Sequence, residues 1–329
     1  MVTKKKNNKK KIFWGILMCF LVVVAVAIVV NRGFIGDLFR AAIYAPSQEM
    51  ELIRSELELT DDGVFLFNAS QPILGDRDSF NDKCSLESDE TTAVLGCYVN
   101  SNIYVYNVVQ EELSGIREVT TAHELLHAAW SRLSDKEKEE LKTQLNQVIK
   151  DYYNVIGDEV NSYDNEDRIE ELYVRAGTEI KDLPQALEKH YGKWFKYQDK
   201  IVDYYDGYSK VFKELKAELE RLENEMESLK TSYEAKISEY EGRISNLNTQ
   251  IDEFNSCAET AGCFNSQWAF NQRRAQLVDE QNALNALYDE ISNLINEYNT
   301  RVDKYNQDAI YNQKLNQIIN SSVKVEENI

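Results

Sequence analysis

The stretch Thr121-Ala122-His123-Glu124-Leu125-Leu126-His127-Ala128-Ala129-Trp130 contains the pattern H-E-x-x-H. Residues four apart on a helix lie one turn apart on the same face, so His123 and His127 can direct two imidazole nitrogens at one metal ion. Glu124 is the residue type that takes a proton from metal-bound water, whose pKa a zinc ion lowers to about 7. The stretch therefore predicts two protein ligands of a zinc site and its general base.

Apolar residues at helical spacing surround the two histidines. They are Val119, Ala122, Leu126, Ala129, Trp130 and Leu133. This stripe predicts a helix that is buried on one side and whose histidines face a cleft. The alternative is an ordinary amphipathic helix that carries two histidines. The chain has only three histidines among 329 residues, and two of them fall at this spacing, which favours the metal site.

A third ligand must come from another part of the chain. The closed pattern H-E-x-x-H-x-x-G-x-x-H is excluded, because residues 128–147 contain no histidine. His190 or a carboxylate remains, and we expect His190 at the surface or in packing. The segment Arg168–Gly177 predicts a helix that ends at its glycine, and this helix carries carboxylates.

With a carboxylate on a downstream helix, the chain resembles the gluzincin class of zinc metallopeptidases. The resemblance covers His123–His127 and Glu170–Gly177. It implies that Glu171, which precedes the bulky Leu172 and Tyr173, is the third ligand. Glu170 is the alternative.

The same resemblance implies an α+β zincin-like metallopeptidase domain, mainly helical, over residues 32–198. Tyr163 can place its hydroxyl over the cleft and hydrogen-bond a developing oxyanion, as a Tyr does in some similar enzymes. The alternative is that Tyr163 is simply one of nineteen tyrosines. If neither Glu170 nor Glu171 binds the metal, His190 and Glu166 are the remaining candidates.

The N-terminal residues have the pattern of a membrane anchor. Residues 1–11 hold six Lys and no acidic residue, and an uncharged apolar run follows from Ile12 to Val30. That length spans a bilayer, whereas a cleavable signal peptide has a shorter apolar core. The pattern predicts an N-terminal transmembrane helix over 12–31 in the plasma membrane, with a basic cytoplasmic tail over 1–11 and the rest of the chain outside.

Four of the five cysteines form two local pairs, Cys84 with Cys97 and Cys257 with Cys263. Paired cysteines suit an oxidising compartment, so we expect two disulfides. Neither pair has the C-x-x-C spacing of a zinc knuckle, and free buried thiols are the alternative.

Several shorter elements are expected around the H-E-x-x-H helix. Gln48–Leu59 predicts a short helix, Val64–Phe67 a buried strand, and residues 70–95 an irregular loop. Asn102–Val108, rich in β-branched and aromatic residues, predicts a second strand. This strand either offers an exposed edge to an extended peptide beside the cleft or is a plain core strand. Ser134-Asp135-Lys136-Glu137 is a capping box that starts another helix.

The C-terminal half has the heptad pattern of a coiled coil, with apolar residues at alternating gaps of four and three. The first seam begins with Ile201, Tyr205, Tyr208, Phe212, Leu215, Leu219, Leu222, Met226 and Leu229. A matching seam follows Cys263. Two seams joined by a short segment predict an antiparallel α-helical coiled-coil hairpin over 199–319, with its tip at 255–267 and a flexible tail over 320–329. Pairing with a second chain is the alternative.

The formal net charge of −19 excludes a broad basic face for nucleic acid. The sequence therefore predicts a membrane-anchored, extracytoplasmic zinc metallopeptidase that hydrolyses a peptide or protein substrate. Its coiled coil would act as a spacer or dock a protein partner. The alternative is a non-catalytic cell-surface scaffold whose metal site is structural or degenerate.

Overall fold

The computed structural model describes residues 13–18, 20–23, 32–84, 94–161, 163 and 165–321. The chain divides into two compact units. The first comprises Met1–Val211 and Asn316–Ile329, and the second comprises Phe212–Leu315. The structure is 78% helical, with one three-stranded sheet among the described residues. The prediction of an α+β class is therefore wrong, because helices make up nearly all of the regular structure.

Among the described residues, the nine helices α2 to α10 lie wholly in the first unit. They are α2 (Arg32–Ile43), α3 (Gln48–Glu56), α4 (Asp61–Ser70), α5 (Arg77–Asn81), α6 (Ile116–Trp130), α7 (Asp135–Asp151), α8 (Tyr153–Asn161), α9 (Asn165–Glu179) and α10 (Gln185–Tyr191). A short 3-10 helix, η1 (Glu111–Leu113), precedes α6. The capping box at Ser134 and Glu137 is confirmed at the start of α7.

The sheet has the strand order β1-β3-β2, with β1 at Ile73–Gly75, β2 at Gly96–Val99 and β3 at Asn102–Tyr106. Strand β1 runs parallel to β3, and β2 runs antiparallel to it. Alternate residues of β3, Ile103 and Val105, are fully buried in the core. The predicted second strand therefore exists, but it lies in the centre of the sheet. The interpretation of Asn102–Val108 as an exposed edge strand is therefore wrong. The two edge strands of this sheet are β1 and β2.

Helix α4 replaces the strand that was predicted at Val64–Phe67. The side chain of Thr60 accepts a hydrogen bond from the backbone N–H of Gly63, and Asp61 and Asp62 occupy the first turn. This N-cap and the negative charges near the positive end of the helix dipole favour a helix at this point. The apolar run continues this helix to Ser70, and its buried residues include Leu66 and Phe67.

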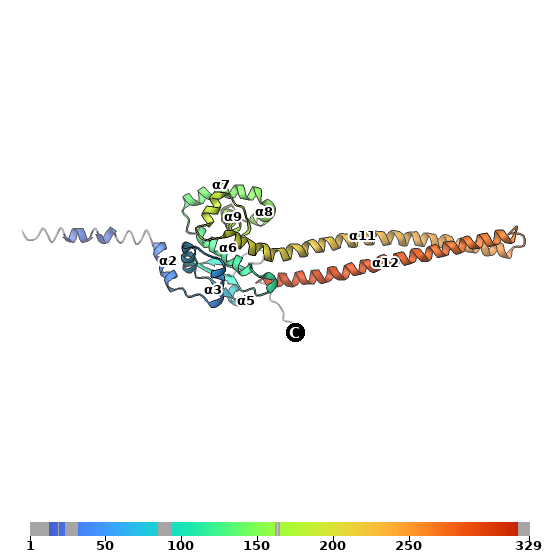
Figure 1. The fold of residues 1–329 in the computed structure, drawn as a ribbon, viewed down its shortest axis with the longest axis horizontal. Coiled ribbons are helices and arrows are strands. Elements are labelled where there is room, and N and C mark those ends of the chain that lie inside the picture. Colours follow the sequence, from blue (N-terminus) through green and yellow to red (C-terminus); the bar gives the residue numbers. More distant parts are fainter. Residues whose placement is uncertain are drawn as a thin grey trace, which may run out of the picture. The chain divides into compact units, whose positions relative to one another are not determined.

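Helix α6 is central to the first unit, since it contacts α9 on one side and strands β2 and β3 on another. Figure 1 shows α7, α8 and α9 on one side of α6, and α3 and α5 on the other. The shared core includes Leu125 and Leu126 of α6, Tyr173 of α9, Ile53 of α3 and Val105 of β3. This position fixes the H-E-x-x-H segment within a packed scaffold.

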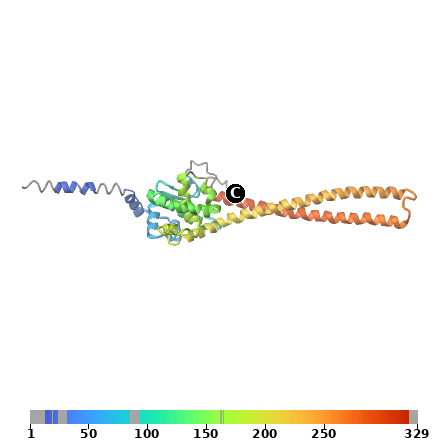
Figure 2. The same ribbon diagram turned by 90° about the horizontal axis from the view of Figure 1, so that it is seen from above.

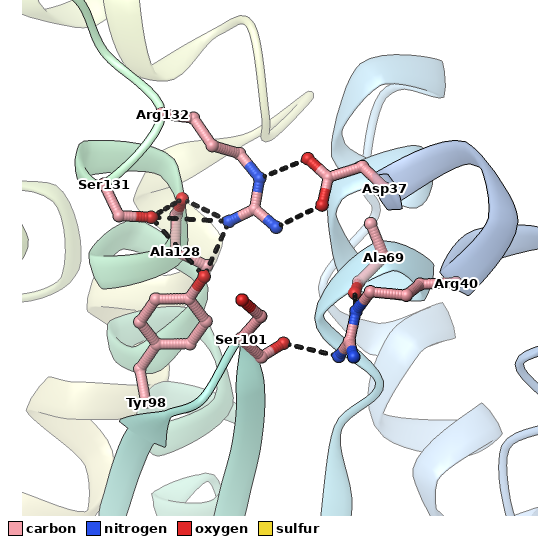
Figure 3. Close-up of polar contacts among 8 residues, drawn as sticks. All are labelled: Asp37, Arg40, Ala69, Tyr98, Ser101, Ala128, Ser131 and Arg132. Carbon is pink, nitrogen blue, oxygen red and sulfur yellow. Dashed lines mark hydrogen bonds and ion pairs between the residues drawn. The ribbon is translucent and has the colours of Figure 1, made fainter. Parts of the chain in front are cut away.

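Arg132, just after α6, attaches α2 to the same scaffold (Figure 3). Its Nε and Nη2 donate to the two carboxylate oxygens of Asp37, each at 2.8 Å. Its Nη1 donates to the hydroxyl of Tyr98 at 2.8 Å and to the carbonyl of Ala128 at 2.7 Å. A two-bond contact between guanidinium and carboxylate fixes the orientation of the two groups as well as their distance, so it ties Asp37 of α2 to the end of α6.

The end of α12 (Gln267–Ile319) also belongs to the first unit through hydrogen bonds beside α5. The Nη1 of Arg77 donates to the carbonyl of Asn320 at 2.9 Å. The Nδ2 of Asn81 donates to the carbonyl of Ser321 at 2.6 Å, and the hydroxyl of Ser321 donates to the carbonyl of Val94 at 3.1 Å. Residues 322–329, the remainder of the expected flexible tail, lie outside the described residues.

The predicted transmembrane helix over 12–31 requires correction. A bilayer-spanning helix needs about 20 consecutive apolar residues, and no helix in the described parts of the chain is long and apolar enough. Residues 13–18 and 20–23 are helical, whereas residues 1–12, 19 and 24–31, which include the expected basic tail, lie outside the description. The described residues therefore do not support the prediction of a single-pass plasma-membrane protein.

The second unit is formed by the greater part of two long helices, α11 (Gln198–Glu259) and α12. Figures 1 and 2 both show the two helices side by side. Arg243 pairs with Glu280 at 2.9 Å, and Arg301 pairs with Glu225 at 2.7 Å. The residue number rises along one helix as it falls along the other, so the helices are antiparallel. The turn between them lies inside the expected tip segment.

Both expected disulfides are confirmed. Cys84 is bonded to Cys97 in the first unit, and Cys257 is bonded to Cys263 in the second. The first bridge links the turn that follows α5 to strand β2. The second closes the end of α11 onto the turn that leads into α12.

Candidate metal centre

The residue that caps the start of helix α6 is a glycine, and its conformation and its packing both require one. Gly115 has a φ of +96°, a backbone conformation that side chains other than glycine rarely adopt. A Cβ atom at this position would also lie 2.9 Å from the Cβ of Tyr204. The helix then buries one face in the core through residues such as Ala122, Leu125 and Leu126. His123 and His127 are only partly buried and line a cavity.

Helix α9 brings the third candidate ligand to the two histidines. The Oε2 atom of Glu171 lies 3.9 Å from Nε2 of His123 and 3.6 Å from Nε2 of His127. The ligand atoms of these three residues all lie within 4.8 Å of one another. Nitrogen and oxygen ligands at about 2.0–2.1 Å from a tetrahedral zinc ion are about 3.3 Å apart. The group can therefore hold a metal ion after small side-chain movements.

Glu170, the alternative ligand, lies on the other side of the His127 ring. Its Oε1 atom is 2.8 Å from Nδ1 of His127, so the Nε2 atom is left toward Glu171. Burial would lower the pKa of His127, but the hydrogen bond with Glu170 and the nearby carboxylates outweigh it and raise that pKa. A carboxylate on the outer nitrogen of a metal-binding histidine fixes its ring orientation and makes it a stronger ligand.

His123 has the opposite electrostatic setting. Burial, followed by the charges of His127 and Arg175, lowers its pKa well below the ordinary value. His123 is therefore neutral at physiological pH, and the neutral imidazole is the form that binds a metal ion.

Glu171 is buried, with 4% of its surface exposed, and is held by a cation on its own helix. The Nε atom of Arg175 donates to its Oε1 atom at 2.6 Å. The Nη1 atom of Arg175 donates to Glu179 at 3.0 Å. Glu171, Arg175 and Glu179 are spaced four residues apart, so they share one face of α9.

Glu124 lies in the same cavity and is almost fully buried, with 5% of its surface exposed. Burial raises the pKa of Glu124 to about 7. The charge of His127 lowers this pKa, whereas the charges of Glu171 and Glu170 raise it. Strand β2 passes directly beside it, because a Cβ atom on Gly96 would lie 2.6 Å from Oε1 of Glu124. The carboxylate is therefore enclosed between α6 and β2.

The cavity has a volume of about 450 Å³. Its walls include strand β2 on one side and the rings of Tyr163, Tyr205 and Tyr208 elsewhere. Tyr163 thus lies in the cavity as the sequence suggested, although its neighbours 162 and 164 are outside the described residues. Tyr205 and Tyr208 had been assigned to the coiled-coil seam, but they pack against the core of the first unit.

The remaining candidate ligands are not brought to the centre. His190 is buried on α10, where its Nε2 atom lies 3.0 Å from the hydroxyl of Tyr173, and it does not line the metal cavity. The side chain of Glu166 lies outside the described residues.

Sequence reasoning missed three residues that shape the centre, namely Arg175, Glu179 and Gly96. The spacing Glu-x-x-x-Arg-x-x-x-Glu in α9 was a readable signal for the first two. Nothing local to Gly96 could have identified its contact with Glu124, because the two residues are far apart in the chain.

The chain was compared with protein-family models, with curated proteins and with solved structures, and none of them matches. The geometry of the centre is therefore the basis for a functional assignment.

Proposed function

We propose that this chain is a zinc-dependent metallopeptidase that hydrolyses peptide bonds and resembles the gluzincins in its ligand set. The observation that carries the proposal is the position of Glu124. It is buried on the same helix as His123 and His127, in the wall of the cavity that also holds Glu171.

The donor set supports zinc as the metal. Two imidazoles and one carboxylate, with a fourth position open, are typical of catalytic zinc sites in peptidases, whereas calcium and magnesium prefer oxygen ligands. When bound, a zinc ion supplies Lewis acidity toward a carbonyl oxygen and lowers the pKa of a water molecule to about 7.

Glu124 serves as the general base and then as the general acid in this proposal. It accepts a proton from the attacking water and passes it to the amine that leaves when the peptide bond breaks. The neighbouring Tyr163 lines the same cavity, and its hydroxyl donates a hydrogen bond to the oxyanion that develops on the substrate.

An extended peptide is the substrate that this cavity suits. Residues 94–98 of its wall include most of β2, and the edge of β2 away from β3 pairs with no strand that the structure describes. An unpaired edge can hydrogen-bond a peptide as an additional strand. Such binding would place the peptide backbone beside Glu124, across the contact at Gly96.

The test uses the purified full chain, measurement of bound zinc, and a library of fluorogenic peptides. We expect about one zinc per chain in the parent and in the Glu124→Gln variant, because Glu124 is not a ligand. Hydrolysis should fall by about 10²- to 10⁴-fold in Glu124→Gln, since an amide cannot accept the proton. Glu118→Gln, on the first turn of the same helix, is the matched control and should cleave like the parent.

Two results would contradict the proposal. A Glu124→Gln variant that keeps zinc and cleaves as fast as the parent would show that Glu124 is not the base. A parent chain that binds zinc and cleaves no peptide in the library would favour a structural metal site in a non-catalytic scaffold.

A further inference from the structure

The two oxygens of the Glu171 carboxylate have different surroundings. Oε2 is the oxygen directed at the histidines, 3.9 Å from Nε2 of His123 and 3.6 Å from Nε2 of His127. Oε1 accepts a hydrogen bond from Nε of Arg175 at 2.6 Å. One oxygen of the Glu171 carboxylate therefore faces the candidate metal position, and the other is bound by Arg175.

Arg175 is itself held in place from its other side. Its Nη1 atom donates to Oε1 of Glu179 at 3.0 Å, and both glutamates have less than a tenth of their side-chain surface exposed. The planar guanidinium has fixed donor directions, so two bonds to two buried carboxylates define its orientation. All three residues lie on α9, so a regular helix and not a loop sets their spacing.

A carboxylate can bind a metal ion through one oxygen or through both. Two histidine nitrogens and one carboxylate oxygen leave a fourth position open, which a catalytic zinc site needs for water or substrate. A second carboxylate oxygen would compete for that position. The number of Glu171 oxygens that are available therefore bears directly on whether the centre can be catalytic.

We propose that Arg175 is a positioning residue that occupies Oε1 of Glu171, restricts this ligand to one oxygen and so keeps a coordination position open. This inference rests on the proposed metal centre. In this inference Arg175 does more than orient Glu171, because it prevents the second oxygen of Glu171 from binding the metal ion. Loss of an orienting partner lowers metal affinity by about 10- to 100-fold, whereas loss of Arg175 would let both oxygens of Glu171 bind and would preserve affinity.

Cobalt(II) is the probe for the test, because its visible absorption reports coordination geometry. Four-coordinate cobalt absorbs severalfold more strongly than five-coordinate cobalt. We expect one cobalt per chain and strong absorption in the parent. Arg175→Met should keep one cobalt, bind it at least as tightly, and absorb severalfold more weakly. Arg168→Met is the matched control, because Arg168 lies on the same helix but does not line the metal cavity, and this variant should keep the strong absorption of the parent.

The outcomes are separable. A parent chain that binds no cobalt would overturn the proposed metal centre together with this inference. Strong absorption in Arg175→Met, or a loss of cobalt binding in that variant alone, would overturn only the role of Arg175. X-ray absorption of the zinc-loaded parent tests the same point if Arg175→Met does not fold. Four light-atom ligands are expected, and two Glu171 oxygens at bonding distance would refute the inference.

Discussion

At the scale of single residues, the three histidines of the chain occupy two kinds of environment. His123 and His127 line a cavity beside Glu171, whereas His190 is buried against Tyr173. The same side-chain type is thus available as a ligand in one place and as a packed hydrogen-bonding partner in the other. This contrast provides a matched control within one molecule.

We expect the variant with His123→Ala and His127→Ala to lose stoichiometric zinc, because only one carboxylate of the ligand set remains. His190→Ala should keep about one zinc per chain, although it loses a buried contact. Metal analysis after gel filtration measures both. Zinc that remains stoichiometric in the double variant would place the metal elsewhere.

His190 should make the stability of the first unit depend on pH. Burial and then the charge of Lys193 lower its pKa to about 4, against about 6.5 for an exposed histidine. Between these values the unfolded chain binds more protons, so the free energy of unfolding rises with pH. The contribution is present above about pH 6.5 and is lost as the pH falls toward 4.

The measurement is urea unfolding at several pH values between 4 and 7.5, with a chelator present so that metal release does not contribute. The parent should lose up to ~3 kcal/mol more than His190→Gln over this range. Equal pH dependence in the two proteins would show that His190 is not held in its neutral form.

At the scale of elements, the close approach of β2 to α6 depends on one missing side chain. A Cβ atom on Gly96 would lie 2.6 Å from Oε1 and 2.7 Å from Cγ of Glu124, and 2.7 Å from Cγ2 of Thr120. Such distances require the strand or the carboxylate to move. The position of strand β2 and the position of the Glu124 carboxylate therefore depend on each other.

Gly96→Ala should lower the free energy of unfolding by about 1–3 kcal/mol, as added volume in a packed region does. Peptide hydrolysis should fall as well, because Glu124 is displaced, while zinc content stays near one per chain. Gly207→Ala on α11 is the control, since a Cβ there meets nothing within 4 Å. It should be neutral or stabilising by up to about 1 kcal/mol. An equal effect of the two substitutions would contradict the close packing.

Elements whose signals are local could be predicted from the sequence, and elements whose character depends on distant contacts could not. The spacing of His123 and His127 and the capping box at Ser134 are local, and both lie where expected. Helix α4 was mistaken for a buried strand because it is apolar on two sides. Phe67 packs into the core, while the ring of Phe65 lies 5.8 Å from that of Phe34 on α2. A helix covered on both sides loses the periodicity that distinguishes it from a strand.

The dependence on distant contacts also explains why the sequence alone could not decide the third ligand of the metal centre. Glu171 was preferred over Glu170 on resemblance alone, and only the packing of α9 against α6 separates their positions. The heptad pattern likewise does not show which core an apolar residue packs into. Ile201 and Tyr205 fit the coiled-coil seam, yet they pack in the first unit.

At the scale of the whole molecule, each of the two units has its own disulfide, so the effects of the two should be independent. Removing the Cys84–Cys97 bridge with serines should lower the stability of the first unit by ~3 kcal/mol, the loop-entropy value for a loop of this size. Because Cys97 lies in β2, hydrolysis should fall too. Removing the Cys257–Cys263 bridge should leave zinc content and hydrolysis unchanged.

Metal analysis, peptide hydrolysis and calorimetry on the two double variants measure these effects, and each variant is the control for the other. A similar loss of hydrolysis in both would show that the two units do not respond separately.

The first unit is discontinuous in the chain, because Phe212–Leu315 separates its two parts. During synthesis, Arg77 and Asn81 therefore leave the ribosome long before Asn320 and Ser321, whose carbonyls accept their hydrogen bonds. At ~5–20 residues per second, the roughly one hundred residues that separate the two parts of the first unit, Phe212–Leu315, take ~5–20 s to make. Throughout that interval the nascent first unit exposes an unfilled docking site beside α5, and the long helices are translated before it can close.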